Sequence, residues 1–200
     1  IAYMDKLLKN QTRDMEFTTY KVLATSKNDG FVEFVTGSKT IDSVIKQTDK
    51  DSIKIFLEGL SKSKNRSYDD LFNSYMNSCA AYCVATYILG IGDRHLENIL
   101  ITDKGRLFHI DFGFILGKDP KPYPPPMKLS PKMIELFSDE NLSKFKSICC
   151  DMYHILRQNA GLIVNLFYLM IHSGIPDICE NHENALKKLH DKFLPCLLYT

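Results

Sequence analysis

Two short polar clusters in this 200-residue chain hold the residue types that phosphate chemistry needs. One cluster contains Asp93, His95 and Asn98. The other is the run His-Ile-Asp-Phe-Gly, whose aspartate is Asp111. A carboxylate and an amide oxygen suit a hard cation such as Mg²⁺, which keeps water and phosphate as its other ligands. Because an aspartate or a histidine can accept a proton from an attacking hydroxyl, the two clusters together indicate phosphoryl transfer.

The residues between the clusters predict a β-hairpin. Residues 99–101 are apolar, residues 102–105 (Thr-Asp-Lys-Gly) have turn chemistry, and residues 107–110 form a second largely apolar stretch. Antiparallel pairing of the two stretches would place Asn98, before the first strand, and Asp111, after the second, at the same end of the hairpin. We therefore expect these two side chains to be metal ligands.

The elements around the hairpin are predicted to be mainly helical, because apolar residues recur at spacings of three and four along much of the chain. Two strands, at residues 17–24 and 30–35, are predicted before the hairpin, joined by a turn over residues 27–30. A flexible stretch is expected after residue 38, and a polar loop over residues 61–67. The predicted helices are 1–8, 41–47 with a cap at Thr40, 52–60, 67–87 with a cap at Ser67, one that starts at Pro131, 138–156, 160–172 and 183–193.

The composition argues against several classes of protein. With 44% hydrophobic residues the chain can bury the core of one domain, and a net charge of +1 argues against nucleic-acid binding. The longest apolar run, residues 162–171, is too short to cross a membrane, so any membrane contact is expected to be peripheral. The cysteines show no spacing typical of zinc sites or disulfides, and we expect reduced intracellular thiols. They are Cys79, Cys83, Cys149, Cys150, Cys179 and Cys196.

The two clusters resemble the catalytic loop and the Asp-Phe-Gly metal loop of the phosphatidylinositol 3-kinase and 4-kinase superfamily, distant relatives of protein kinases. Residues 93–95 read Asp-Arg-His, the inverse of the His-Arg-Asp order of protein kinases, which points to the lipid-kinase branch. Residues 117–129 read Gly-Lys-Asp-Pro-Lys-Pro-Tyr-Pro-Pro-Pro-Met-Lys-Leu. This run resembles the activation segment of class III, vacuolar-sorting-type phosphatidylinositol 3-kinases, and the resemblance covers nearly the whole chain.

The resemblance implies an α+β, protein-kinase-like fold of two lobes. Residues 1–38 would be the end of the small lobe and the hinge, and residues 39–200 a mainly helical large lobe. The catalytic loop would be residues 90–98 and the activation segment residues 111–129. The family's phosphate-covering loop and ATP-contacting lysine have no counterpart here, and the chain opens at Ile1 in helical rhythm. We therefore expect a fragment that is inactive alone.

The reaction implied is transfer of the ATP γ-phosphoryl group to the 3-hydroxyl of phosphatidylinositol, with ATP and Mg²⁺ or Mn²⁺ as cofactors. Asn98 and Asp111 would hold the cation. Asp93 and His95 would both be needed as catalytic residues, and which of them takes the proton stays open. Arg94, the third residue of this catalytic set, is expected to hold the loop through a buried ion pair rather than to contact phosphate.

Six residues would contact ATP by resemblance, although as bare sequence they read as ordinary strand and core positions. Hinge residues would hydrogen-bond the adenine edge through their backbone, an aromatic residue would line the back of the pocket, and two hairpin residues would form its floor. They are Glu33, Phe34 and Val35 at the hinge, Tyr20 at the back, and Leu100 and Ile110 in the floor. His109 is interpreted as a packing residue beside the metal aspartate.

The predicted substrate loop carries Lys118, Lys121 and Lys128, scattered among prolines. A headgroup with additional phosphates would need a denser group of cationic donors, so this pattern favours plain phosphatidylinositol. The prolines fix φ and stiffen the loop, which lowers the entropy lost when it becomes ordered at a membrane.

The nearest alternatives are a phosphatidylinositol 4-kinase and a related protein kinase, which share both clusters, and a catalytically inactive scaffold lobe. The proline-rich loop resembles neither of the first two, and the presence of Asp93, Asn98 and Asp111 argues against the third. The resemblance also implies two partners, phosphatidylinositol in membranes and a regulatory kinase-like scaffold subunit. It further implies a cytoplasmic location, peripheral on endosomal or autophagic membranes.

Overall fold

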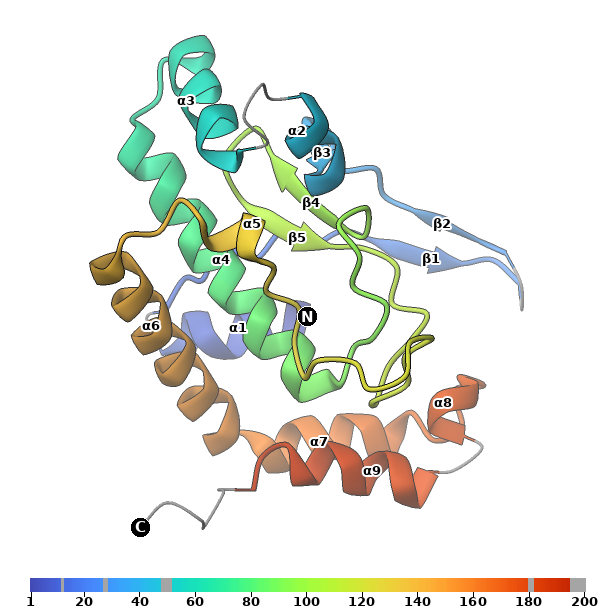
Figure 1. Ribbon diagram of the computed structural model, residues 1–200. Helices are drawn as coiled ribbons and strands as arrows, with labels where there is room; N and C mark the ends of the chain where they lie inside the picture. Colours follow the sequence, from blue (N-terminus) through green and yellow to red (C-terminus); the bar gives the residue numbers. More distant parts are fainter. Residues whose placement is uncertain (12, 27–28, 48–51, 180–181, 195–200) are drawn as a thin grey trace.

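The computed structural model describes residues 1–11, 13–26, 29–47, 52–179 and 182–194 (Figure 1). Two positions of the predicted turn, Lys27 and Asn28, and one of the cysteines, Cys196, lie outside these residues. The five cysteines that are described are free thiols, as expected. Within the described ranges, no helix is both long enough and apolar enough to cross a membrane.

Helix α4 (Tyr68–Leu89) runs through the centre of the fold (Figure 1). Every side chain from Ser78 to Thr86 is buried, as expected for a helix that is apolar on nearly all of its faces. Helix α6 (Asp139–Gln158) packs along it on one side and the hairpin on another. The helix ends at Gly90, whose φ of 57° is a left-handed conformation that glycine adopts without a steric penalty. This cap delivers the chain to the first polar cluster.

The predicted hairpin is present and belongs to a three-stranded antiparallel sheet. Strand β4 (Ile99–Thr102) pairs with β5 (Leu107–His109), and Ile99 lies opposite His109. Strand β3 (Ser38–Thr40) pairs with the other edge of β4, where the sequence predicted a flexible stretch. That prediction was wrong, because a three-residue polar strand has too little apolar alternation to be recognised without its partner.

The two strands predicted ahead of the hairpin form a separate antiparallel ribbon. Strand β1 (Val22–Ala24) pairs with β2 (Gly30–Val32), so both strands are shorter than predicted. Phe17 explains part of the difference: its buried ring packs edge-on against Tyr82 of α4, with ring centroids 5.1 Å apart. The segment before β1 therefore packs against the helical core and does not extend the ribbon.

The remaining helices largely follow the hydrophobic pattern. Helix α3 continues through most of the predicted polar loop, because its lysines suit a helix C-terminus, and it ends at Asn65 with φ 50°. The Thr40 hydroxyl accepts a hydrogen bond from the Ser43 N–H (3.1 Å), which confirms that cap, whereas Ser67 occupies the cap position without a side-chain hydrogen bond. The bounds are α1 (Ala2–Asn10), α2 (Ile41–Gln47), α3 (Ile53–Lys64), α5 (Pro131–Ile134), α7 (Ala160–Leu169), α8 (Pro176–Cys179) and α9 (His182–Asp191).

Candidate functional site

A cleft of about 590 Å³ opens between the β1–β2 ribbon and the β4–β5 hairpin. All six side chains predicted to contact ATP line it: Tyr20, Glu33, Phe34, Val35, Leu100 and Ile110. Sequence reasoning did not assign five further lining residues to the cleft: Val22, Val32, Ser38, Phe108 and Phe112. The first four carry no motif, and Phe112 was noted only as part of the Asp-Phe-Gly motif. A mostly apolar cleft with a few polar groups suits a flat heterocycle that carries a polar edge. Asp111 also lines the cleft, so the metal loop adjoins the space that would take the nucleotide.

Two contacts fix the walls of this cleft. The Tyr20 hydroxyl donates to the His109 carbonyl (3.3 Å), which ties the back of the cleft to β5. The Glu33 N–H donates to the Lys21 carbonyl (2.9 Å), and the Lys21 N–H donates to the Glu33 carboxylate (2.8 Å). Because the N–H of Glu33 is already used, a backbone contact between this residue and adenine would be made by its carbonyl oxygen.

The hairpin register brings the two proposed metal ligands to the same end of the sheet. The Ile110 N–H donates to the Asn98 carbonyl (3.0 Å), and Asp111 follows immediately. The buried Asn98 amide donates through Nδ2 to the Asp93 carbonyl (3.0 Å), which leaves its Oδ1 as an acceptor. Asp111 is exposed, and its Oδ1 accepts from the Gly113 N–H (3.2 Å).

The side-chain oxygen atoms of Asn98 and Asp111 fit a hard divalent cation. One amide oxygen and one carboxylate provide oxygen ligands and leave the other positions to water and phosphate, as Mg²⁺ prefers. Across the described ranges, no group of three or more His, Cys, Asp or Glu side chains is arranged to hold a metal.

The proposed catalytic pair lies on the loop that enters β4. Asp93 has a left-handed backbone with φ 53°, and its carbonyl accepts from the His95 N–H (3.2 Å). The His95 imidazole is partly exposed, with Nε2 3.9 Å from the Asp93 carboxylate and Nδ1 3.9 Å from that of Glu97. These distances are too long for hydrogen bonds. Both groups thus remain available to a substrate hydroxyl, and the choice between them as proton acceptor stays open.

Arg94 holds the two polar clusters together. The residue is only 7% exposed, and its guanidinium donates from Nε to the Gly92 carbonyl (2.7 Å) and from Nη1 to the Ile110 carbonyl (2.7 Å). Nη2 donates to the Asp111 carbonyl. Burial lowers the pKa of Arg94, and the nearby carboxylates of Asp111 and Asp93 oppose that shift. The loop-holding role fits the structure, but the hydrogen bonds go to main-chain carbonyls and not to a carboxylate as the predicted ion pair required.

His109 is a packing residue in this structure. Its ring is buried and stacks on Tyr82, with centroids 4.8 Å apart and an angle of 15° between the planes. Burial, with a smaller contribution from the Arg94 charge, lowers the pKa of His109 to about 3, so its side chain is neutral at ordinary pH. Its Nδ1 has no hydrogen-bond partner among the described residues.

The predicted substrate loop passes close to the catalytic loop. A small hollow of about 60 Å³ is lined by Asp93 and Arg94 on one side and by Lys121 and Lys128 on the other. Lys118, the third predicted lysine, is exposed and does not line this hollow. Two of the three cationic side chains therefore lie beside the proposed catalytic aspartate.

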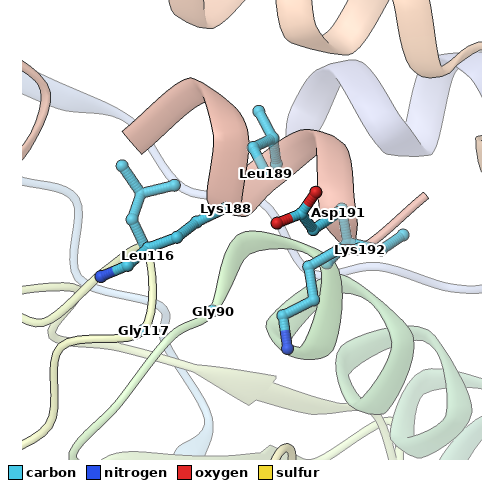
Figure 2. Close-up of a pocket in the computed structure, with 8 residues that line it drawn as sticks. Gly90, Leu116, Gly117, Lys188, Leu189, Asp191 and Lys192 are labelled. Carbon is cyan, nitrogen blue, oxygen red and sulfur yellow. The ribbon is translucent and has the colours of Figure 1, made fainter. Parts of the chain in front are cut away.

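A backbone seam, which sequence reasoning missed, joins the two loops. The N–H groups of Gly92, Leu116 and Gly117 donate to the carbonyls of residues 114, 89 and 90 at 2.8–2.9 Å. Gly90 and Gly117 line a cavity of about 280 Å³ together with residues 188 and 189 of α9. Figure 2 shows the two glycines on one side of this cavity and α9 on the other. The sequence signal for this close approach of the two loops was the set of glycines that flank the motifs. A Cβ on Gly90 would lie 2.5 Å from the Gly117 nitrogen, so the contact requires a residue without a side chain.

Comparison with known proteins identifies the class to which this arrangement belongs. The sequence model of the family described as phosphatidylinositol 3- and 4-kinase matches residues 1–179. The chain is 45% identical over 199 residues to "Phosphatidylinositol 3-kinase, nodule isoform" of Glycine max, across 96% of this chain and 24% of that protein. It is 45% identical over 196 residues to "Phosphatidylinositol 3-kinase VPS34" of Arabidopsis thaliana, across 95% and 24% of the two chains. The same-named protein of Saccharomyces cerevisiae is 44% identical over 199 residues, across 96% and 22%.

The chain therefore belongs to the phosphatidylinositol 3- and 4-kinase family. The predicted family and the α+β fold are confirmed. The chain spans about a quarter of the length of the relatives it matches.

Proposed function

We propose that this chain is the hinge and large catalytic lobe of a phosphatidylinositol 3-kinase that transfers the γ-phosphoryl group of ATP to the 3-hydroxyl of phosphatidylinositol. One observation carries the proposal. The cleft lined by the six candidate ATP residues is also lined by Asp111, and the register of the β4–β5 hairpin brings Asn98 to the same end of the hairpin as Asp111. The names of the relatives support the lipid substrate and the 3-position.

In this proposal residues 1–38 are the end of the small lobe and the hinge, and residues 39–200 the large lobe. The apolar walls of the cleft hold the adenine ring and exclude water from it. Asn98 Oδ1 and the Asp111 carboxylate would hold Mg²⁺ or Mn²⁺, which when bound with ATP neutralises charge on the transferring phosphate. Asp93 and His95 orient the attacking hydroxyl, and one of the two accepts its proton. Arg94 keeps the two loops at a fixed separation and does not itself contact phosphate.

The substrate loop supports an inositol lipid with no phosphates beyond its phosphodiester. Lys121 and Lys128 lie beside Asp93, and two lysines match a single phosphodiester better than a headgroup with several phosphates. The proposal includes phosphatidylinositol in membranes and a regulatory kinase-like scaffold subunit as partners. It also includes a cytoplasmic site of action, peripheral on endosomal or autophagic membranes.

The test is a lipid-kinase assay on the intact protein that contains this chain, with labelled ATP, Mg²⁺ or Mn²⁺, and vesicles of phosphatidylinositol or its 4-phosphate or 4,5-bisphosphate. We expect label only from phosphatidylinositol, at the 3-position. Asp111→Ala should lower turnover by about 10²-fold or more, because the cation loses its carboxylate ligand.

The matched control is Asp103→Ala. Asp103 lies at the opposite end of the same hairpin, 3.5 Å from Lys64, and its loss should leave turnover unchanged. Label at the 4-position would identify a phosphatidylinositol 4-kinase, and label on protein alone a protein kinase. Equal activity of Asp111→Ala and the intact protein would show that the metal site is wrongly assigned.

A further inference from the structure

Asp119 is a residue of the substrate loop whose two carboxylate oxygens each accept a hydrogen bond from the backbone. Its Oδ2 accepts a hydrogen bond from the backbone N–H of Asp93 (2.8 Å). Its Oδ1 accepts from the backbone N–H of Lys121 (2.8 Å). One carboxylate thus bridges the catalytic loop and the segment that would face the lipid.

The backbone that Asp119 holds is an unfavourable one. Asp93 has a φ of 53°, a left-handed conformation that is strained for a non-glycine residue and persists only where surrounding contacts hold it. The Asn98 amide donates to the Asp93 carbonyl (3.0 Å), so the residue is restrained on its carbonyl side as well. Asp119 supplies the restraint on the N–H side.

The same two loops are in direct backbone contact at Gly92. A Cβ on this glycine would lie 2.1 Å from the Lys118 carbonyl oxygen and 2.8 Å from Asp119 Oδ2. Only a residue without a side chain allows the substrate loop to come this close to Asp93. Burial alone would raise the pKa of the Asp119 carboxyl, but hydrogen bonds from the Lys121 and Asp93 N–H groups lower it, so the group is charged at neutral pH.

We propose that Asp119 is a positioning residue that fixes Asp93 in its catalytic orientation and so couples the conformation of the substrate loop to phosphoryl transfer. The inference rests on the proposed function for the role of Asp93. The contact itself does not depend on that role. A substrate loop displaced from the catalytic loop would release the Asp93 backbone, and the aspartate would no longer be held toward the hydroxyl.

The experiment compares Asp119→Asn with the intact protein and with Asp151→Asn as a matched control. Asparagine has the shape of aspartate but only one acceptor oxygen, so it satisfies one of the two N–H groups and presents an NH₂ group to the other. Asp151 is an aspartate of α6 that pairs with Arg13 (2.8 Å), outside the cleft and both loops. Two readouts are taken: hydrogen exchange of the peptide covering residues 90–98, and the kinetics of phosphatidylinositol phosphorylation.

We expect faster exchange in this peptide for Asp119→Asn alone, with kcat about 10-fold to 100-fold lower and an unchanged KM for ATP. The ATP cleft does not include Asp119, so a displaced Asp93 should affect transfer and not nucleotide binding. Unchanged hydrogen exchange of the 90–98 peptide would overturn the inference. Equal losses in kcat, ATP affinity and melting temperature would also overturn it, because they would indicate a merely structural role for Asp119. If the intact protein labels no phosphatidylinositol, the proposed function fails, while the exchange result still decides whether Asp119 restrains Asp93.

Discussion

Substitution of Arg94 tests whether its guanidinium holds the catalytic and metal loops together. The side chain donates to the Ile110 and Asp111 carbonyls of the metal loop, which joins the two loops at two points, and to the Gly92 carbonyl of its own loop. Arg94→Lys keeps the positive charge but replaces a planar fork with a single ammonium group. Arg94→Ala removes both the charge and the fork.

The magnitude follows from the hydrogen bonds lost. A hydrogen bond to a charged donor contributes about 1.5–3 kcal/mol, and the contributions are not fully additive. For Arg94→Ala we expect the free energy of local opening around this site to fall by about 3–5 kcal/mol. For Arg94→Lys we expect about 2 kcal/mol, because one ammonium on a flexible stem reaches only part of the carbonyl set.

The assay is native-state hydrogen exchange on the intact protein, which reports local opening free energies without requiring the whole molecule to unfold in one step. The amides to follow are those of Ile110 and Gly92, which donate to the Asn98 and Phe114 carbonyls across the two loops. Arg13→Lys is the control, since an exposed arginine paired with an exposed aspartate should change stability by less than about 0.5 kcal/mol. Exchange and turnover of Arg94→Lys equal to those of the intact protein would refute the reasoning, because charge alone would then suffice.

Three further experiments test packing, a buried hydrogen bond and an ion pair of the fold. Gly90→Ala should lower the melting temperature and the yield of folded protein, because φ is 57° and the new Cβ would lie 2.5 Å from a backbone nitrogen. The control is Gly161→Ala in α7, which should be neutral or stabilising because no atom lies within 4 Å of the new Cβ. Tyr75→Phe should lower the free energy of unfolding, measured by thermal or chemical denaturation, by about 1–2 kcal/mol, because the buried hydroxyl donates to an α5 carbonyl at 2.9 Å. An unchanged free energy of unfolding would mean that water replaces this hydrogen bond. Glu16 and Arg106 form a partly exposed ion pair with their charged atoms 2.8 Å apart. A double-mutant cycle on the two residues should give a coupling free energy of about 0.5–1 kcal/mol that decreases as salt is added. A coupling free energy that does not change with salt would contradict an ionic contact.

The hairpin could be predicted because its signals are local. Two apolar stretches flank a turn that ends at Gly105, whose φ of 77° is favourable only for glycine, and this alone fixes the register within one or two residues. The register then decides that Asn98 and Asp111 emerge at the same end. The candidate ATP residues, in contrast, came from resemblance, because a Phe or a Val in a strand looks the same whether it lines a cleft or fills a core.

The contacts that join the loops could not be predicted in the same way. Asp119 accepts a hydrogen bond from a residue 26 positions away, and the Arg94 fork reaches a carbonyl 17 positions away. Such contacts depend on where the seam places the two loops, and neither hydrophobic period nor turn chemistry encodes that placement. The ion pair expected for Arg94 illustrates the difficulty, since a buried guanidinium needs acceptors but the sequence does not say whether carboxylates or carbonyls provide them.

The structure separates the residues that would act on substrate from those that hold them. Asp93 and Asp111 both have left-handed backbones, with φ of 53° and 55°, and strain of this kind persists only where surrounding contacts fix it. Those contacts are made to main-chain atoms: Asp119 binds the Asp93 N–H, and Arg94 binds the Asp111 carbonyl. Because neighbouring side chains restrain both backbones, each loop keeps a restraint when its own carboxylate is removed, although the metal loop then loses the hydrogen bond from the Gly113 N–H to Asp111. We therefore expect substitutions of Arg94 and Asp119 to loosen the site while leaving its functional groups in place, and substitutions of Asp93 and Asp111 to remove those groups from a site that keeps its shape.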